Sequence, residues 1–237
     1  IFFAFFLGTL TVISFQPFNF SAINFFILPI FFLLTTYVKK KSVSIYRKKP
    51  YLKNLFFVGF MFGFGFYLSG IFWISYSLTF DDNFKFLIPF ALIIIPLFLG
   101  LFYGLTTLII GYFLSYNFSS LLLFSGSLAL SDYVRGKILT GFPWNLWAYS
   151  WSWLTEVLQI LNIFGLFAFN LLTITIFAIP AVIFFKCATS KKIFIISSTF
   201  LLIFLTYIYG SFIINKNEIL INNFDKNNKV YTKVISP

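Results

Sequence analysis

The sequence predicts an all-α membrane protein, a polytopic bundle of about seven transmembrane helices, and three observations carry that prediction. Hydrophobic residues make up 60% of the chain and charged residues only 10%, and the mean hydropathy is +0.95. Soluble domains contain roughly 25% charged residues. Apolar windows of about 20 residues, the length that crosses a bilayer core of roughly 30 Å, recur along the chain. Basic residues gather in short stretches between these windows, as is typical of cytoplasmic loops.

Each apolar window is interpreted as one membrane-crossing helix. The opening run, 1–15, is apolar but short, and it lacks the basic flank of a signal peptide, so we interpret it as the remainder of a first helix whose start is missing. Gln16 and Pro17 separate this run from the next span, because proline cannot donate a helical hydrogen bond. The six further spans are expected at about 20–38, 54–78, 86–114, 119–137, 158–185 and 192–213.

The charges between the spans predict the orientation. Seven of the 17 basic residues fall within 39–53, and three more fall within 186–192. When these segments are placed in the cytoplasm, the loops 79–85 and 138–157 lie on the opposite side, which is the periplasm of a Gram-negative cell. The expected location is therefore the inner membrane. The net charge of +11 reflects this topology, and we expect no nucleic-acid partner.

Small residues in two spans predict close helix packing. Gly59 and Gly63 are four residues apart, as are Gly100 and Gly104, and this spacing lets helix backbones approach each other within a bilayer. The sixth span contains polar residues that we expect to form hydrogen bonds between helices, namely Asn162, Asn170, Thr173 and Thr175. These features are interpreted first as packing within one bundle.

One cysteine and no histidine limit the chemistry that the chain can perform. Without histidine there is no Ser–His or Cys–His nucleophile pair and no metal site that uses histidine. Cys187 lies in a basic loop and is interpreted as an incidental residue at the membrane surface. We therefore expect no nucleophile, and no metal or cofactor site, within these 237 residues.

The character of the sequence changes after residue 213. Residues 215–228 are mostly polar and resemble a linker, and residues 229–237 are rich in β-branched and aromatic side chains, which favour a strand. A single strand is not stable alone, so we expect it to be the first strand of a further domain. The predicted organisation is a helix bundle over 1–213, and a linker with a first strand over 214–237.

The most informative segment is 131–149. Asp132 and Arg135 are three residues apart, so on a helix they share a face and can form an ion pair. Charged residues in membrane helices are costly and often functional, although headgroups can hydrate a pair near a helix end. Two interpretations remain open. The pair fixes the helix geometry, or Arg135 binds a phosphate or carboxylate with its planar fork.

An aromatic loop, residues 138–157, follows this pair. Gly136 and Gly141 are expected to let the backbone turn along the membrane surface. The loop contains the aromatic residues Trp144, Trp147, Tyr149, Trp151 and Trp153. Such residues are typical of the belt that anchors a protein at the membrane interface, so composition alone predicts an anchor.

The segment Ser-Asp-Tyr-Val-Arg-Gly-Lys-Ile-Leu-Thr-Gly-Phe-Pro-Trp-Asn-Leu-Trp-Ala-Tyr, residues 131–149, resembles the Glu-x-x-Arg-Gly and Thr-Gly-Phe-Pro-Trp signature of the bacterial apolipoprotein N-acyltransferases. It differs in having Asp132 in place of the usual Glu, and Ala148 in place of Gly. Three other segments resemble family motifs in the same order, namely Phe15-Gln-Pro-Phe18, Gly63-Phe-Gly-Phe-Tyr-Leu-Ser-Gly-Ile-Phe-Trp-Ile-Ser75 and Gln159-Ile-Leu-Asn-Ile-Phe-Gly165.

This resemblance implies an eight-helix bundle with an outward-facing nitrilase-like domain, of the carbon–nitrogen hydrolase superfamily, inserted between the seventh and eighth helices. The strand expected after residue 228 would then begin a truncated α/β nitrilase-like domain. The family's Glu-Lys-Cys triad takes an acyl chain from a phospholipid as a thioester and transfers it to the α-amine of a diacylglyceryl-cysteine lipoprotein. The triad is expected beyond Pro237, so this chain alone is expected to be inactive.

The resemblance also assigns a candidate substrate site, which consists of Asp132, Arg135, Gly136, Gly141, Phe142, Pro143, Trp144 and Tyr149. The implied partners are a phospholipid acyl donor, a diacylglyceryl-apolipoprotein acceptor and membrane lipid. The alternative from another class is a transporter or channel subunit, and a third is a membrane anchor for an outward domain. Transporters usually carry ionisable groups at the membrane midplane and internal repeats, and the sequence shows neither.

Overall fold

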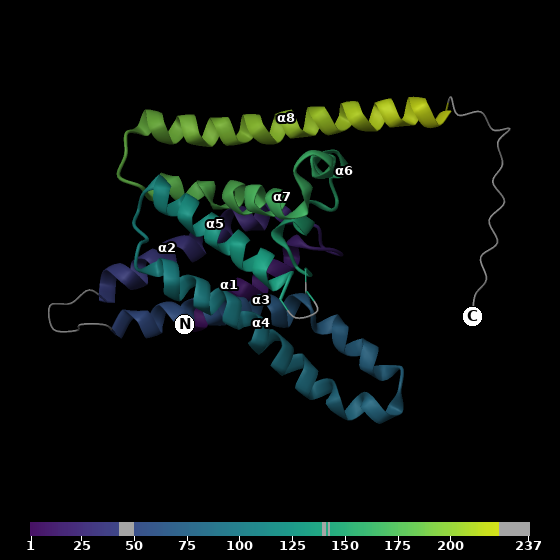
Figure 1. Cartoon of the computed structure of the whole chain (residues 1–237). Coiled ribbons are helices and arrows are strands. Elements are labelled where there is room, and N and C mark those ends of the chain that lie inside the picture. Colours follow the sequence, from purple (N-terminus) through teal and green to yellow (C-terminus); the bar gives the residue numbers. More distant parts are fainter. Residues whose placement is uncertain (43–49, 139–140, 142, 223–237) are drawn as a thin grey trace.

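The computed structural model describes residues 1–42, 50–138, 141 and 143–222, and every regular element in these ranges is helical. The α-helices are α1 (Phe2–Leu10), α2 (Asn24–Ser42), α3 (Pro50–Gly70), α4 (Ile88–Gly111), α5 (Phe118–Arg135), α6 (Thr155–Leu158), α7 (Leu161–Ala178) and α8 (Thr189–Asn222) (Figure 1). The connecting 3-10 helices are η1 (Thr11–Ser14), η2 (Ser21–Ile23), η3 (Phe72–Thr79), η4 (Asp82–Leu87), η5 (Trp147–Trp151) and η6 (Ile179–Phe184).

Five helical segments are long and apolar enough to cross a membrane, which agrees with an all-α membrane protein. They are Ser21–Lys41, Leu52–Gly70, Asp82–Gly111, Leu161–Phe184 and Thr189–Asn222. The apolar helix Phe2–Ser14 is shorter. Helix α5 is less apolar than these spans because it carries five serines together with Asp132 and Arg135.

The glycine pairs on α3 and α4 confirm the prediction of close packing. A Cβ atom built on Gly63 would lie 2.9 Å from the Cβ atom of Tyr103 on α4. A Cβ atom built on Gly100 would lie 3.0 Å from the backbone nitrogen of Phe64 on α3. Any side chain at these positions would therefore push the two helices apart, so the short distance between their backbones depends on glycine.

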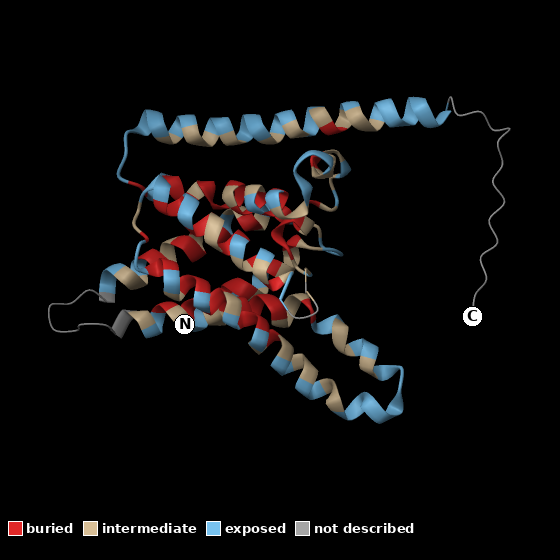
Figure 2. Ribbon diagram, viewed as in Figure 1, coloured by how far each residue is buried: buried red, intermediate tan, exposed pale blue. Residues whose placement is uncertain are grey.

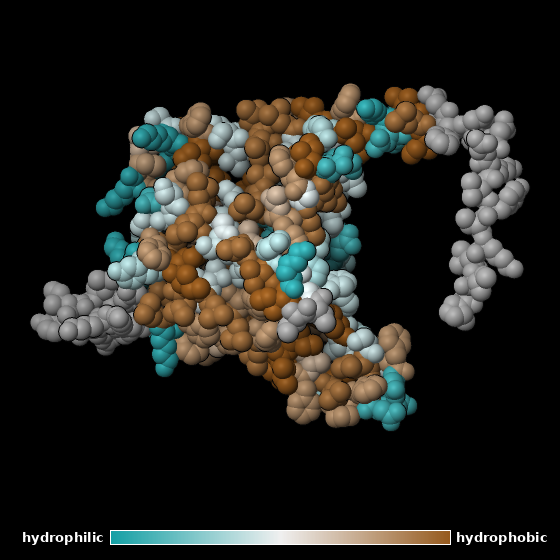
Figure 3. Space-filling view, in the orientation of Figure 1, coloured by the Kyte–Doolittle hydropathy of each residue, from teal (hydrophilic) through white to brown (hydrophobic). Residues whose placement is uncertain are grey.

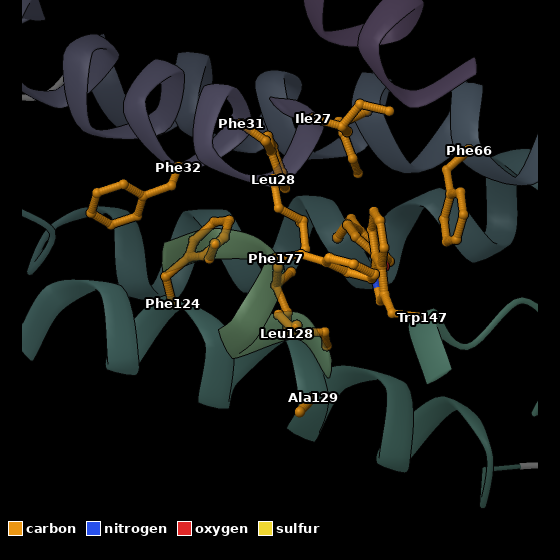
Figure 4. Packing of buried hydrophobic residues seen from close by; sticks show 14 of the residues in the cluster. Ile27, Leu28, Phe31, Phe32, Phe66, Phe124, Leu128, Ala129, Trp147 and Phe177 are labelled. Carbon is orange, nitrogen blue, oxygen red and sulfur yellow. The ribbon is translucent and has the colours of Figure 1, made fainter. Parts of the chain in front are cut away.

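Aromatic side chains fill the centre of the bundle (Figure 4). The rings of Phe31 on α2 and Phe62 on α3 stack with their centroids 3.9 Å apart, and Phe124 on α5 meets Phe31 edge-on at 5.4 Å. Trp147 enters this cluster from the aromatic loop and stacks on Phe66 at 5.1 Å. Such pairs contribute about 0.5–1.5 kcal/mol each beyond the area that they bury. The core therefore extends from α2 to the aromatic loop.

Two parts of the chain are mostly exposed and lie at the margin of this core, as the colouring of Figure 2 shows. One is the arm formed by η3, η4 and the start of α4, where Phe80 is 92% exposed. The other is α8, in which Gly210 is the one buried residue within the described helix. Helix α8 continues to Asn222, so residues 214–222, expected to begin a linker, are helical; no proline or glycine interrupts the helix between Gly210 and Asn222. The strand expected over 229–237 lies outside the described residues.

The connections between helices gather at two opposite ends of the bundle (Figure 1). The end of α2, the start of α3 and the connections from α4 to α5 and from α7 to α8 lie at one end, here called the basic end. Its described lysines are Lys39, Lys40, Lys41, Lys53, Lys186, Lys191 and Lys192. The aromatic loop, α6, the arm and the end of α8 lie at the other end. Figure 3 shows hydrophilic residues toward both ends and hydrophobic residues between them.

Candidate functional site

The ion pair at the end of α5 lies inside the protein. The Nη2 atom of Arg135 lies 3.2 Å from Oδ1 of Asp132, and each side chain is only 1% exposed. The predicted pairing on one helix face is therefore confirmed, but the expectation that headgroups hydrate the pair is wrong. The sequence suggested hydration because the pair stands near a helix end, whereas α3, α7 and the aromatic loop cover that end in the folded chain.

Arg135 connects α5 to two other parts of the molecule. Its Nη1 atom donates a hydrogen bond of 2.8 Å to the backbone carbonyl oxygen of Trp144 in the aromatic loop. Its guanidinium carbon lies 5.1 Å from the centroid of the Tyr67 ring on α3, which is within the range of a cation–π interaction. The planar fork thus binds the protein's own loop.

Asp132 continues the network toward α7. Its Oδ2 atom accepts a hydrogen bond of 2.9 Å from Nδ2 of Asn170, and Oδ1 of Asn170 accepts one of 3.0 Å from the backbone N–H of Ala148. Asp132, Arg135 and Asn170 therefore form a buried clamp that holds the aromatic loop at two points, Trp144 and Ala148. The clamp accounts for both oxygens of the carboxylate.

The expectation of hydrogen bonds between helices is confirmed for Asn170, although its second partner, in the aromatic loop, was not foreseen. Thr175 instead donates to the carbonyl oxygen of Leu171 within its own helix. The hydroxyl of Thr173 is buried without a hydrogen-bond partner among the described residues, and Asn162 is exposed. The polar residues of α7 thus differ in role according to the face of the helix that they occupy.

The two glycines of the motif act differently. Gly141 has a φ of +77°, a conformation that side chains disfavour, so the predicted turn is confirmed there. Gly136 has an ordinary helical φ of −71°. A Cβ atom at Gly136 would lie 2.9 Å from the ring of Phe167 on α7, so this glycine serves close packing and not a turn.

The tryptophans of the aromatic loop divide into two groups, so the predicted interfacial belt is wrong for half of them. Trp147 and Trp151 are buried, and the Nε1 of Trp147 donates a hydrogen bond of 2.8 Å to the hydroxyl of Tyr103. Trp144 and Trp153 are 49% and 48% exposed. The indole of Trp144 meets that of Trp73 edge-on, with the ring centroids 5.2 Å apart. Composition cannot separate these groups, because tryptophan suits both a core and an interface.

The exposed side of the loop borders an open groove of about 970 Å³. The groove is lined by Val12, by the turn Phe15 to Phe18, by Ser69, Gly70, Phe72 and Trp73, and by Trp144, Asn145, Tyr149 and Ser152. Three segments that resemble family motifs, far apart in the sequence, thus border one groove. Burial raises the pKa of the Tyr149 hydroxyl above its usual value, while the nearby Arg135 charge lowers it.

The structure therefore separates the predicted site residues. Trp144 and Tyr149 line the groove, whereas Asp132 and Arg135 lie behind it within the protein. Gly136, Gly141 and Pro143 lie between Arg135 and Trp144 in the sequence, and Gly136 ends α5 whereas Gly141 forms a turn. Phe142 lies outside the described residues. Asn170, which the sequence analysis did not assign to the site, holds the loop as directly as Arg135 does.

The sequence profile of the apolipoprotein N-acyltransferase N-terminal domain matches residues 7–179. The chain belongs to this family. It is 32% identical over 177 residues to the apolipoprotein N-acyltransferase of Rhodopseudomonas palustris, a match that covers 74% of this chain and 32% of that protein. It is 31% identical over 215 residues to that of Rickettsia typhi, with 90% of this chain and 40% of that protein covered.

A third relative, the apolipoprotein N-acyltransferase of Brucella melitensis, is 36% identical over 127 residues, which are 53% of this chain and 24% of that protein. The matched part of the chain thus spans about a third of the length of such relatives. The family domain, residues 7–179, contains the clamp and the groove in full.

Proposed function

We propose that this chain is the membrane part of an enzyme that transfers an acyl chain from a phospholipid to the α-amine of the diacylglyceryl-cysteine of lipoproteins. In the first step a thiolate attacks an ester carbonyl of the phospholipid, a thioester forms and a lysophospholipid leaves. In the second step the lipoprotein amine attacks the thioester, an amide forms and the thiolate is released. Family membership and the names of the relatives support this proposal.

The nucleophile of this reaction is proposed to lie beyond residue 237, in a nitrilase-like domain that carries the Glu-Lys-Cys triad. The single cysteine of the chain, Cys187, is exposed at the basic end, opposite to the groove. Helix α8 ends at Asn222 on the same side of the bundle as the aromatic loop (Figure 1). A domain that follows α8 could therefore stand over the groove.

The proposed topology has about seven membrane crossings, with α1 and α5 added to the five long segments. The alternation of the connections between the two ends of the bundle supports it (Figure 1). We propose that the basic end faces the cytoplasm and the aromatic loop faces the periplasm of a Gram-negative cell, because lysines favour cytoplasmic loops. This arrangement brings the groove to the side on which lipoproteins are modified.

Within this enzyme, the groove is proposed to receive lipid substrates and the clamp to hold its wall. Trp144 and Tyr149 are the predicted site residues that can touch a lipid, because both line the groove. Asp132 and Arg135, with Gly136, Gly141 and Pro143, are proposed to position the loop, and Phe142 keeps its proposed role in substrate binding. The hydrogen bond from Arg135 to the carbonyl oxygen of Trp144 is the observation that carries this division of roles.

Substitution of Trp144 in the full-length enzyme tests this proposal. Trp144→Ala should slow thioester formation from a phospholipid donor, because it removes an aromatic wall of the groove. Trp153→Ala is the matched control, since Trp153 is equally exposed but lies outside the groove. Acyl transfer should be measured at equal amounts of membrane protein. Equal activity of both variants would show that the groove does not take part in acyl transfer. A full-length wild-type protein without any acyl transfer would favour the transporter alternative.

A further inference from the structure

A second cavity opens at the basic end, on the opposite side of the bundle from the groove. Its volume is about 630 Å³. Its floor is apolar and consists of Phe3 on α1, of Ile30, Leu33 and Leu34 on α2, and of Phe184 in η6. A pocket of this size falls within the usual range for sites that bind small molecules. Its walls come from helices that cross the apolar part of the bundle, so the cavity can receive hydrocarbon chains.

The rim of this cavity is polar and positively charged. It consists of Tyr37 and Lys40 at the end of α2, Tyr116 in the connection from α4 to α5, and Lys186 in the connection from α7 to α8. The Nζ atom of Lys40 lies 5.9 Å from the centroid of the Tyr116 ring. The end of α2 and two connections thus bring two ammonium groups and two phenols to one opening, next to an apolar floor.

The described residues provide no carboxylate for these two lysines. Among them, the acidic side chains are Asp81 and Asp82 in the arm, Asp132 in the clamp, Glu156 in α6 and Glu218 in α8, and all lie toward the opposite end of the bundle. An ammonium group at the edge of an apolar cavity attracts an anion more strongly than one in open water, because the low dielectric weakens the screening. The rim therefore favours a ligand with negative charge at one end.

We infer that this cavity binds an anionic diacyl phospholipid from the leaflet at the basic end. The phosphate would accept hydrogen bonds from Lys40 and Lys186, and the acyl chains would lie along Ile30, Leu33 and Leu34 on the apolar side of α2. Basic pockets between membrane helices recognise anionic headgroups in this way. A free phosphate would leave the apolar floor unfilled, so the lipid fits the whole cavity better. This site is separate from the groove and does not depend on acyl transfer.

Lipid retention by the purified full-length protein tests this inference. Native mass spectrometry in detergent should show one retained phosphatidylglycerol, and phosphatidylglycerol should raise the melting temperature more than phosphatidylcholine or inorganic phosphate does. The double variant Lys40→Gln/Lys186→Gln should bind phosphatidylglycerol about thirtyfold more weakly, since each basic residue near an anionic headgroup contributes about 1 kcal/mol. Leu34→Trp, which fills the floor, should reduce retention while both lysines remain.

The matched control is Lys53→Gln/Lys191→Gln, which removes the same charge from the basic end but outside the cavity. This variant should retain phosphatidylglycerol like the wild type. Equal weakening in both double variants would mean general attraction to a basic surface and would overturn the inference. Equal retention of phosphatidylcholine, an equal effect of inorganic phosphate, or no retained lipid in the wild type would also overturn it. Acyl transfer by the lysine variants should stay near wild type, which keeps this test separate from that of the groove.

Discussion

The guanidinium group of Arg135 donates a hydrogen bond of 2.8 Å to the backbone carbonyl oxygen of Trp144. This contact joins the buried end of α5 to a residue whose indole is exposed in the groove. Arg135 therefore contacts a residue of the groove without lining the groove itself. The alternative in which the arginine fork binds a substrate phosphate requires the side chain to leave Asp132 and Trp144 first.

Arg135→Lys should impair the protein although it keeps the charge. Lysine lacks the planar fork that presents one N–H to Asp132 and another to the carbonyl of Trp144, so the two hydrogen bonds cannot both keep their geometry, and the loss of one charge-assisted hydrogen bond costs about 1.5–3 kcal/mol. Thermal unfolding of the full-length protein in detergent measures this loss. Lys137→Gln, at an exposed position two residues further along, is the control and should unfold like the wild type.

Arg135→Ala should be more severe, because it leaves the buried Asp132 carboxylate without its cation. Removal of one partner of a buried ion pair costs about 3–5 kcal/mol. We therefore expect a lower amount of folded protein in the membrane, whereas an interfacial pair would have left it unchanged. Wild-type stability of both Arg135 variants would show that the clamp does not hold the loop.

Asn170 provides a second test of the clamp, from α7. Asn170→Ala should destabilise the aromatic loop, because both Asp132 and the N–H of Ala148 lose a hydrogen bond. Asn170→Asp should be worse, since it places a second carboxylate beside Asp132. Limited proteolysis of the loop and thermal unfolding measure the effect. Asn162→Ala, at an exposed position of the same helix, should change stability by less than about 0.5 kcal/mol. An equal response of both sites would argue against the clamp.

The glycines of α3 and α5 predict opposite responses to alanine. Gly63→Ala should destabilise the bundle by about 1–3 kcal/mol, because the new methyl group would lie 2.9 Å from the Cβ atom of Tyr103. Gly126→Ala in α5 meets no atom within 4 Å and should stabilise its helix by up to about 1 kcal/mol. Thermal unfolding of the two variants in one detergent compares them. Wild-type thermal stability of the Gly63→Ala variant would mean that α3 and α4 can move apart without loss of stability.

The sequence was sufficient for features that depend on local spacing. Hydropathy located the long apolar segments, the four-residue spacing of Gly59 and Gly63 predicted close helix packing, and the three-residue spacing of Asp132 and Arg135 predicted their pairing. Features that depend on contacts between distant segments could not be predicted in this way. The hydrogen bond from Asn170 to Asp132 joins residues 38 positions apart, and spacing within one helix carries no information about it.

The candidate site shows the same limit. A charged pair at a helix end and a run of tryptophans both suggested a hydrated membrane interface, but the fold encloses the pair and two of the four tryptophans. Trp147 can be buried because its indole N–H donates a hydrogen bond to the Tyr103 hydroxyl on α4. Only the assembled bundle provides this partner. The motif of residues 131–149 selected a segment that contributes to both the groove and the clamp, whereas the division between groove residues and clamp residues required the structure.

The orientation of the chain gives the last prediction, which uses its single cysteine. Cys187 is exposed at the basic end, and Asn83 is exposed in the arm at the opposite end. If the basic end faces the cytoplasm, a membrane-impermeant thiol reagent should not label the wild-type full-length protein at Cys187 in intact cells with a permeabilised outer membrane. The same reagent should label Asn83→Cys in a Cys187→Ser background. Peptide mapping separates Cys187 from any cysteine beyond residue 237, and disruption of the inner membrane should expose Cys187 and confirm its reactivity. Labelling of Cys187 but not of position 83 in intact cells would invert the topology and place the groove on the cytoplasmic side.

Cys187→Ser should also leave acyl transfer within about twofold of wild type, because Cys187 is exposed at the basic end, opposite to the groove where the thioester is proposed to form. A loss of several orders of magnitude would assign the nucleophile to the basic end and contradict the proposed division between membrane platform and outward domain.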